Sequence, residues 1–374
     1  MSHPIVVITI MLLSLFIASA MTGNLVRDSR IYESLARHSA IDGARGFLAI
    51  SVMTHHFYIT YVWKKTGEWV APTSRVLENL GAVPVSIFFM ITGYLFLSKI
   101  KKGNTNWTEI YKGRLARIYP LYITVGLLCF VLILASVSNI HSIQVLKSAF
   151  DWILFRGGDI GNINPNRLIA GVNWTLAYEA VFYLLLPLIS LVLRSNNTSW
   201  KSIIFTAPIA IALAIHTSAI FYLLFLLSFL SIKRIKLIEL SVEKFKKTTS
   251  LALMVLIIIT MLYTNAYSIL QMCLVLTIFI MIRNGVDMFG FLNFNGMKKL
   301  GDISYSIYLT HGFIIYLMFT YLHIYDFKNG FYHYIIFYPL VLFIVISISL
   351  TTYKFIEFPC FNRSNKKQKT KTGI

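Results

Sequence analysis

The chain has 374 residues, of which 57% are hydrophobic and 13% are charged, and its mean hydropathy is +0.69. Soluble domains carry roughly 25% charged residues and lack repeated apolar runs of about 20 residues, so this composition excludes a soluble protein. The formal net charge of +19 comes from basic residues that lie mainly between the apolar runs. Basic residues in that position orient helices in a bilayer, so we expect no nucleic-acid partner.

The apolar runs predict eleven transmembrane helices, and therefore an all-α polytopic membrane protein with the lipid bilayer as its surroundings. In chain order the predicted spans cover residues 4–22, 45–63, 80–98, 118–138, 174–193, 202–217, 219–232, 250–264, 268–282, 300–322 and 333–353.

The basic residues predict how these helices are oriented. When alternate loops are assigned to opposite sides, 27 of the 34 Lys and Arg residues fall on one side and 7 on the other. Because positive loops stay in the cytoplasm, we predict an N terminus outside and a cytoplasmic C terminus with a basic tail at 361–374. The seven basic residues of the outer side lie in segments 64–79, 139–173 and 323–332.

The first apolar run combines features of a cleavable signal peptide and of a retained helix. It ends in Ala18-Ser19-Ala20, which resembles a signal-peptidase site. A cleavable signal begins with positive residues, however, and only His3 precedes this run, whereas arginines follow it. We therefore predict an additional transmembrane helix with a cytoplasmic linker over residues 1–38.

Ionisable residues inside predicted spans are costly and mark candidate sites. In IDGARGFLAISVMTHHF, Arg45 and His56 are eleven residues apart, close to three helical turns of about 10.8 residues, so they share a face about 16 Å apart along the axis. We expect Arg45 at the cytoplasmic mouth, His56 near the midplane and His55 turned about 80° away. A lone histidine is often only hydrogen-bonded between helices, but the aligned arginine favours a functional role.

Arg114 and Arg117, in KGRLARIYPLY, lie one helical turn apart at the cytoplasmic end of a predicted span. Guanidinium groups bind phosphate through paired hydrogen bonds, so the pair suits a phosphate-bearing ligand. Basic residues are also needed at this end for topology alone, and the sequence leaves both explanations open.

Glu179 is the carboxylate of the predicted span that begins NWTLAYEAVFY. We expect it about 8 Å below the outer surface, with Tyr183 one turn deeper on the same face and Arg45 too far away to pair with it. Two roles remain open, the positioning of a polar acceptor and a structural contact between helices. Glu357, in YKFIEFP, is predicted to pair structurally with a cytoplasmic arginine.

His311 lies in LGDISYSIYLTHGF, about 16 Å from the cytoplasmic start of its predicted span. Ser304, Tyr308 and His311 follow the i, i+4, i+7 pattern and share a face. Two midplane histidines on different helices, His56 and His311, predict a buried polar chamber. A purely structural hydrogen-bond network is the alternative.

Six segments, taken in order from about residue 40 to residue 360, resemble the acyltransferase-3 family of bacterial integral membrane acyltransferases, which includes O-antigen and other polysaccharide O-acetyltransferases. The segments are IDGARGFLAISVMTHHF, SIFFMITGYL, RLARIYPLY, NWTLAYEAVFY, LGDISYSIYLTH and FIEFP. The chain differs from the family in having Thr92 where serine is frequent, and in the additional helix at 4–22.

The resemblance implies a ten-helix acyltransferase domain, here residues 39–360, in the bacterial inner membrane. It implies that acyl-CoA, in particular acetyl-CoA, is a donor substrate from the cytoplasm rather than a bound cofactor, and that the acceptor is a carbohydrate or lipid-linked glycan outside. The matching positions are Arg45 with His56 as an essential pair, Arg114 with Arg117 as a coenzyme motif, Trp174 with Glu179, and His311.

The same resemblance assigns chemistry to these residues. A thioester is already activated, so the acceptor hydroxyl needs a general base, which we assign to His56 with His311 in support. A covalent acyl-histidine intermediate is the alternative. Trp174, Tyr305 and Tyr308 are candidate donors to the oxyanion, and Tyr183 joins them as a substrate-binding candidate.

Two further expectations concern metal binding and transport. Its cysteines, Cys129, Cys273 and Cys360, show no metal-ligand spacing, so we expect no metal. A transporter or flippase of a polar or glycan substrate would also be a helix bundle with polar midplane residues, but it would show inverted repeats and paired helix breaks, which this sequence does not.

Overall fold

The computed structural model describes residues 3–25, 39–103, 105–137, 141–161, 163–193, 200–214, 217–233, 240, 242 and 244–361. The basic tail and most of the predicted linker before residue 39 therefore lie outside the described residues. The described part is helical, and its one extended pairing is an isolated bridge between Ile160 and Ile163.

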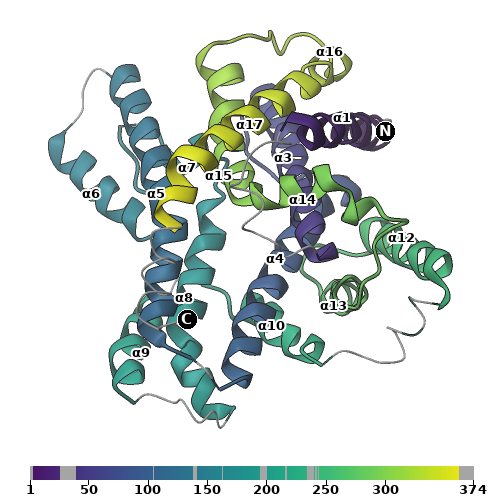
Figure 1. The fold of residues 1–374 in the computed structure, drawn as a ribbon. Helices are drawn as coiled ribbons and strands as arrows, with labels where there is room; N and C mark the ends of the chain where they lie inside the picture. Colours follow the sequence, from purple (N-terminus) through teal and green to yellow (C-terminus); the bar gives the residue numbers. More distant parts are fainter. Residues whose placement is uncertain are drawn as a thin grey trace. The chain divides into compact units, whose positions relative to one another are not determined.

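Each of the eleven predicted spans contains a helix (Figure 1). The first half of the chain forms α1 (His3–Leu25), α3 (Ala40–Thr66), α4 (Arg75–Lys101), α5 (Trp107–Ser136), α6 (Ser142–Ile153), α7 (Pro165–Leu168) and α8 (Asn173–Val192). The second half forms α9 (Trp200–Ala214), α10 (Ala219–Leu227), η1 (Ser228–Ser231), α12 (Lys246–Tyr263), α13 (Ile269–Arg283), η2 (Phe291–Asn293), α14 (Asn295–Asp302), α15 (Ser304–Tyr316), η3 (Leu317–Tyr321), α16 (Phe331–Ile335), α17 (Tyr338–Thr352) and η4 (Tyr353–Glu357).

Six helical segments of the described chain are long and apolar enough to cross a membrane by themselves. They are His3–Thr22, Arg75–Lys101, Trp107–Ser136, Asn173–Val192, Lys246–Tyr263 and Phe331–Phe361. Trp200–Ile211, Ala219–Ser231 and Ile269–Arg283 are apolar but shorter. The prediction of a multi-pass membrane protein is confirmed, whereas the number of eleven spans and their orientation stay predictions.

The predicted span 300–322 is not one straight helix. Asn295–Asp302 and Ser304–Tyr321 pass the hydropathy test together, but they are bent by 70° at the break between them. Ile303 leaves the helical path as the C-cap of α14, with its N–H directed back to Gly301 and Lys299 carbonyls. His311 therefore lies seven residues into α15, about 10.5 Å along that axis, and its depth in the membrane stays a prediction.

The described helices belong to two compact units that alternate along the sequence. The first unit comprises Met1–Tyr94, Leu224–Tyr308 and Met318–Ile346, and the second comprises Leu95–Leu223, Leu309–Leu317 and Ser347–Ile374. Most of α4 and the start of α15 belong to the first unit, and the remainder of each helix belongs to the second.

In the first unit, α3 packs on α14 through glycines. A Cβ atom at Gly43 would collide with the Leu292 carbonyl oxygen in η2, just before α14, and one at Gly301 of α14 would collide with the Asp42 carbonyl oxygen of α3. At Gly46 it would lie 2.8 Å from the Leu300 side chain. Small residues allow the backbones of membrane helices to approach this closely. The two family-like segments IDGARG and LGDIS are thus in direct contact.

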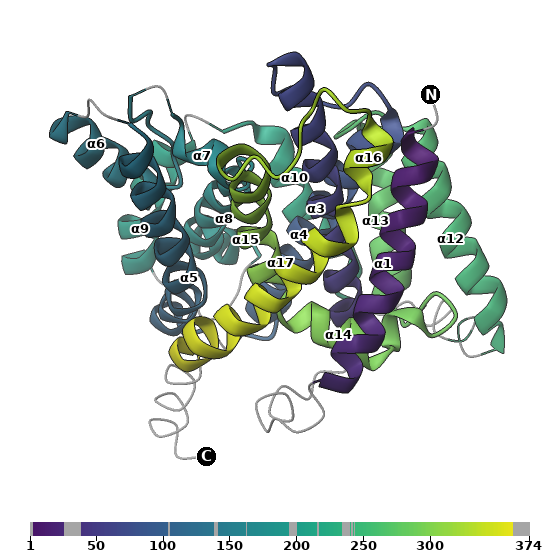
Figure 2. The same cartoon turned by 90° about the horizontal axis from the view of Figure 1, so that it is seen from above.

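The additional N-terminal helix α1 packs on α14 and on α16 (Figure 2). A Cβ atom at Gly296 would collide with the Ser19 carbonyl oxygen, and the Lys299 ammonium group lies 3.5 Å from the Thr22 carbonyl oxygen near the end of α1. One face of α1 is buried, at Val7, Met11, Leu15, Ser19 and Thr22. Its other face exposes Ile5, Leu12, Leu13, Phe16 and Ile17, as suits contact with lipid.

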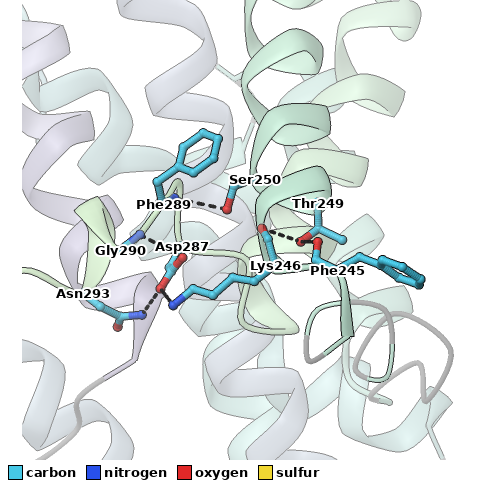
Figure 3. A network of polar contacts seen from close by, with 8 residues as sticks. All are labelled: Phe245, Lys246, Thr249, Ser250, Asp287, Phe289, Gly290 and Asn293. Carbon is cyan, nitrogen blue, oxygen red and sulfur yellow. Dashed lines mark hydrogen bonds and ion pairs between the residues drawn. The ribbon is translucent and has the colours of Figure 1, made fainter.

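A polar network closes the loop after α13 in the first unit (Figure 3). The Asp287 carboxylate accepts hydrogen bonds from Asn293 Nδ2 at 2.9 Å and from the Gly290 N–H at 3.0 Å, and Lys246 Nζ lies 3.1 Å away. Burial acts to raise the pKa of Asp287, but these three donors outweigh it and hold the pKa below its ordinary value. The network fixes the start of α12 against the loop.

In the second unit, α5 and α6 form a hairpin held by aromatic contacts. Trp152 stacks on Tyr122 with ring centres 4.9 Å apart, and the Tyr122 hydroxyl donates to the Trp152 carbonyl at 2.9 Å. Gly126 makes room for the indole, because a Cβ atom there would collide with it. Helix α8 packs on α9 in the same unit.

Candidate functional site

Helix α3 holds Arg45 and His56 on one face. Asp42 accepts hydrogen bonds from the Ser39 N–H at 3.2 Å and from the Ser39 hydroxyl at 3.1 Å, which fixes the helix start one turn before Arg45. The helix is continuous from Ala40 to Thr66, so the eleven-residue spacing does place both side chains on the same face.

The adjacent histidines face different surroundings. His55 Nδ1 lies 2.7 Å from the Leu77 carbonyl oxygen, and its ring packs against Gly81, where an added Cβ would lie 2.7 Å away. His55 is therefore tied to the first turns of α4. His56 instead stacks on Trp69, with ring centres 6.5 Å apart and an interplanar angle of 23°.

Trp69 reaches His56 because the chain reverses direction at the end of α3. Gly67 adopts φ +82°, the left-handed region that favours glycine, and its N–H donates to the Trp63 carbonyl. Trp69 then also contacts Trp63, at 5.4 Å between ring centres. Trp69 was not among the predicted site residues, although a helix-terminating glycine two residues before it was a usable signal.

In the second unit, the side chains of Arg114, Tyr183 and Glu179 are connected. The Tyr183 hydroxyl donates to Glu179 Oε2 at 2.8 Å, one turn away on α8. The Arg114 guanidinium lies 5.9 Å from the centre of the Tyr183 ring and 5.0 Å from that of Phe96.

The start of α5 explains how Arg114 reaches Tyr183. The positions of Arg114 at the cytoplasmic end of its span and of Glu179 near the outer surface stay predictions. Helix α5 begins at Trp107, where the Asn106 side chain accepts from the Glu109 N–H, and not at residue 118. Arg114 therefore lies about 10 Å along α5 and reaches the middle of α8.

Arg117 has different neighbours from Arg114, although the two are one turn apart. Its guanidinium lies 5.9 Å from the ring centre of Phe361, at the end of the last described helix. The preceding segment η4 packs on α5 and contains Glu357, of which only 4% is exposed. The pairing of Glu357 with an arginine stays a prediction.

His311 is completely buried in α15. Its neighbour Gly312 packs against the backbone of Ile169 and Ala170, so closely that a Cβ atom would collide with it. That turn, with positive φ at Ala170 and Gly171, leads directly into α8. Trp174, in the first turn of α8, packs its ring on Tyr178 at 5.5 Å and on Phe221 at 5.1 Å.

The start of α15, up to Tyr308, belongs to the first unit and carries four polar side chains, among them Ser304, Tyr305 and Tyr308. Tyr308 contacts the ring of Phe88, in the segment SIFFMITGYL, at 6.0 Å, and Tyr305 is half-buried. Ser304 is 1% exposed, and its hydroxyl has no hydrogen-bond partner among the residues that the structure describes. A buried hydroxyl in this state suits a place where a polar ligand group or water binds.

The predicted site residues fall in both units. Arg45, His56, Tyr305 and Tyr308 lie in the first, and Arg114, Arg117, Trp174, Glu179, Tyr183 and His311 lie in the second. The chamber shared by His56 and His311 involves both units and stays a prediction. Within the described residues, no group of three or more His, Cys, Asp or Glu side chains is arranged to hold a metal ion.

Comparison with known proteins gives two matches. A family model described as an acyltransferase domain matches residues 38–354, which include every predicted site residue but not α1. The acyltransferase MdmB of Streptomyces mycarofaciens is 27% identical over 158 residues, which make up 41% of this chain and 39% of that protein. The chain thus aligns with about two fifths of the length of this relative. No solved structure matches.

Proposed function

Since the chain belongs to the acyltransferase-3 family and is a multi-pass membrane acyltransferase, we propose that it transfers an acyl group, in particular acetyl, from acyl-CoA to a hydroxyl of a cell-envelope carbohydrate. The donor enters from the cytoplasm, and the acceptor is a glycan or lipid-linked glycan on the outer side of the bacterial inner membrane.

The observation that carries this proposal is the arrangement of α3. Its inner end, in the predicted orientation, carries Arg45, and three turns further His56 stacks on Trp69, which comes from the loop beyond the outer end. A single helix thus extends from the donor side to a histidine next to the outer loop. This is the arrangement that transfer across a membrane requires.

His56 acts as the general base in this proposal. Its neutral imidazole takes the proton of the acceptor hydroxyl while the oxygen attacks the thioester carbonyl, and collapse of the tetrahedral intermediate breaks the carbon–sulfur bond. The departing coenzyme A thiolate then takes the proton back from the imidazolium. Ser304, Tyr305 and Tyr308, which belong to the same unit as His56, are the candidate donors to the oxyanion.

An acyl-histidine intermediate is the alternative sequence of steps. It predicts that the label of a radioactive acyl-CoA is retained on the protein when no acceptor is present. Direct transfer predicts no labelled protein and a requirement for both substrates at once.

The donor contacts are assigned to Arg117 and Arg114. Arg117, near the end of the chain's last described helix, binds phosphate of the coenzyme. Arg114 has a second role, because it contacts the Tyr183 ring and the Tyr183 hydroxyl donates to Glu179. These two contacts connect Arg114 to that carboxylate. The half-buried positions of both arginines favour strong charge-assisted hydrogen bonds to phosphate.

The test is acyl transfer by the purified protein in lipid nanodiscs. Radiolabelled acetyl-CoA is supplied with a panel of envelope glycans, and labelled glycan is the product that we expect. If a folded, monodisperse protein transfers label to none of the glycans and consumes no acyl-CoA of any chain length, the proposed donor and acceptor are wrong.

A further inference from the structure

An open depression of about 530 Å³ lies at the C-terminal end of α3 in the first unit. Two of its residues, Lys64 and Lys65, belong to the last turn of α3, and the others come from the segment between η3 and α16. It is lined by Lys64, Lys65, His323, Tyr325, Asp326, Phe327 and Lys328. In the predicted orientation this depression, which we call the lysine pocket, opens to the outer side.

The charge of the lysine pocket is unusual for that side. The outer segments contain seven basic residues in total, and three of them, Lys64, Lys65 and Lys328, line this one pocket. Basic residues favour retention of a loop in the cytoplasm. Those near an outer helix end therefore act against the orientation that the other loops specify. Topology therefore does not account for this concentration, and ligand binding does.

The three ammonium groups are not neutralised by carboxylates within the part of the chain that the structure describes. Lys65 Nζ donates to the Phe327 carbonyl at 3.2 Å, and Lys64 Nζ lies 5.2 Å from the centre of the Trp63 ring. The Asp326 carboxylate accepts from the Lys328 backbone N–H at 2.9 Å, which shapes the turn. Each ammonium group keeps donor capacity for an anion.

Aromatic rings extend from the lysine pocket to the candidate base. Trp63 lies next to Lys64, Trp69 packs on Trp63 at 5.4 Å, and His56 stacks on Trp69 at 6.5 Å. Lys64 is eight residues beyond His56 on α3, about 12 Å along the axis. Indole rings bind flat apolar faces and still offer a polar N–H, which suits sugar rings between an anchored anion and a reacting hydroxyl.

We propose that the lysine pocket binds the carboxylate or phosphate groups of the acceptor, so that the acceptor is an anionic glycan. Trp63 and Trp69 hold its sugar rings, and His56 receives the hydroxyl to be acylated. This inference rests on the proposed function for the role of His56. The binding of an anionic glycan in the pocket is testable without any acyl transfer.

The first experiment measures binding alone. Fluorescent tetragalacturonate and the neutral galactotetraose are titrated onto the protein in nanodiscs of neutral lipid. We expect tetragalacturonate to bind more tightly, and salt to weaken its binding. Lys64→Gln and Lys328→Gln should each weaken it by about tenfold. Lys64→Arg should retain most of it, and Lys147→Gln, an exposed lysine on the same predicted side, should not change it.

The outcomes separate the two proposals. Equal affinity for the two tetrasaccharides, or unchanged binding in both glutamine variants, overturns the lysine pocket. If tetragalacturonate binding is lost whenever phosphatidylglycerol is added to the nanodisc, the pocket is a lipid headgroup site and the inference is wrong. Charge-dependent binding without any acyl transfer supports the pocket and contradicts the proposed function.

The second experiment measures transfer. The ratio of kcat/KM for the anionic acceptor to that for the neutral acceptor should exceed one, and should fall about tenfold in Lys328→Gln. The same ratio should be unaffected in Lys147→Gln. A ratio that Lys328→Gln leaves unchanged would contradict the assignment even if tetragalacturonate binds.

Discussion

The two candidate regions, α3 in the first unit and the α5–α8 contact in the second, assemble their polar groups in different ways. On α3, Arg45 and His56 are separated by three turns of one helix, and the rings around His56 belong to histidine and tryptophan. Between α5 and α8, Arg114, Tyr183 and Glu179 form one connected chain. The first arrangement favours a proton-transfer group, and the second favours binding of charge. Substitutions in the first region should therefore lower kcat, and those in the second should raise KM.

The largest expected effect comes from His56→Ala. A positioned base contributes about 10²–10⁴ in rate, so acyl transfer should fall by that factor while acyl-CoA binding persists. His55→Ala should retain transfer but lose about 1–3 kcal/mol of stability, because the hydrogen bond to the Leu77 carbonyl and the packing of the ring on Gly81 are lost. Both are measured as transfer rates at matched protein levels in membranes, together with thermal unfolding.

An inactive His55→Ala beside an active His56→Ala would reverse the assignment of the two histidines. It would also remove the argument that α3 is the catalytic region, and with it the difference between the two regions.

Arg117→Ala should have the next largest effect. Losing one charge-assisted contact with phosphate costs about 1.5–3 kcal/mol, so KM for acyl-CoA should rise by about tenfold to more than a hundredfold with kcat nearly constant. Arg117→Lys should recover only part of this loss, because an ammonium group cannot form the paired hydrogen bonds of a guanidinium. Unchanged KM in correctly inserted protein would mean that Arg117 serves topology alone.

Tyr183→Phe sharpens the comparison within the second region. Phenylalanine retains the ring beneath the Arg114 guanidinium but removes the hydrogen bond to Glu179. We expect KM for acyl-CoA to rise by about tenfold, which is the effect of losing one hydrogen bond to a charged group. Tyr119→Phe is the matched control, since its hydroxyl donates only to an Ile153 carbonyl at an exposed position, and it should stay within about twofold. Equal effects in both variants would show that the chain from Arg114 to Glu179 has no role in binding.

The smallest effect concerns the polar network at Asp287, which includes Asn293 of η2 but none of the predicted site residues. Because the pKa of Asp287 is lower in the folded protein than in the unfolded chain, its stabilisation is present above the unfolded pKa and is lost as the pH falls through the folded pKa. Asp287→Asn should lower the free energy of unfolding by about 1 kcal/mol at neutral pH. It should also make that free energy fall less steeply as the pH is lowered. Transfer kinetics should not change, and a kinetic change would place this loop in the catalytic cycle.

Helix positions and spacings along one helix were predictable, whereas contacts between helices were not. The eleven helical segments follow from runs of apolar residues, and the shared face of Arg45 and His56 follows from helical periodicity alone. Membership in the acyltransferase family is confirmed by the match over residues 38–354. The roles assigned to individual site residues stay predictions.

The features that escaped prediction depend on local backbone geometry or on distant partners. Hydropathy averages over residues 300–322 and cannot detect the 70° bend at Ile303. The contact of Arg114 with Tyr183 depends on α5 starting eleven residues before its apolar run, where Asn106 caps it. The position of Trp69 depends on the left-handed turn at Gly67, and the lysine pocket joins residues more than 250 positions apart.

The glycine contact between α3 and α14 has a mechanical consequence for turnover. Packed helices slide past one another by small adjustments of the side chains between them, but at Gly301 the backbone of α14 meets the Asp42 carbonyl of α3 with no side chain between them. The two helices are therefore expected to move as a single lever. If His56 is the base, motion that opens its surroundings is then expected in the loop around Trp69 rather than between α3 and α14.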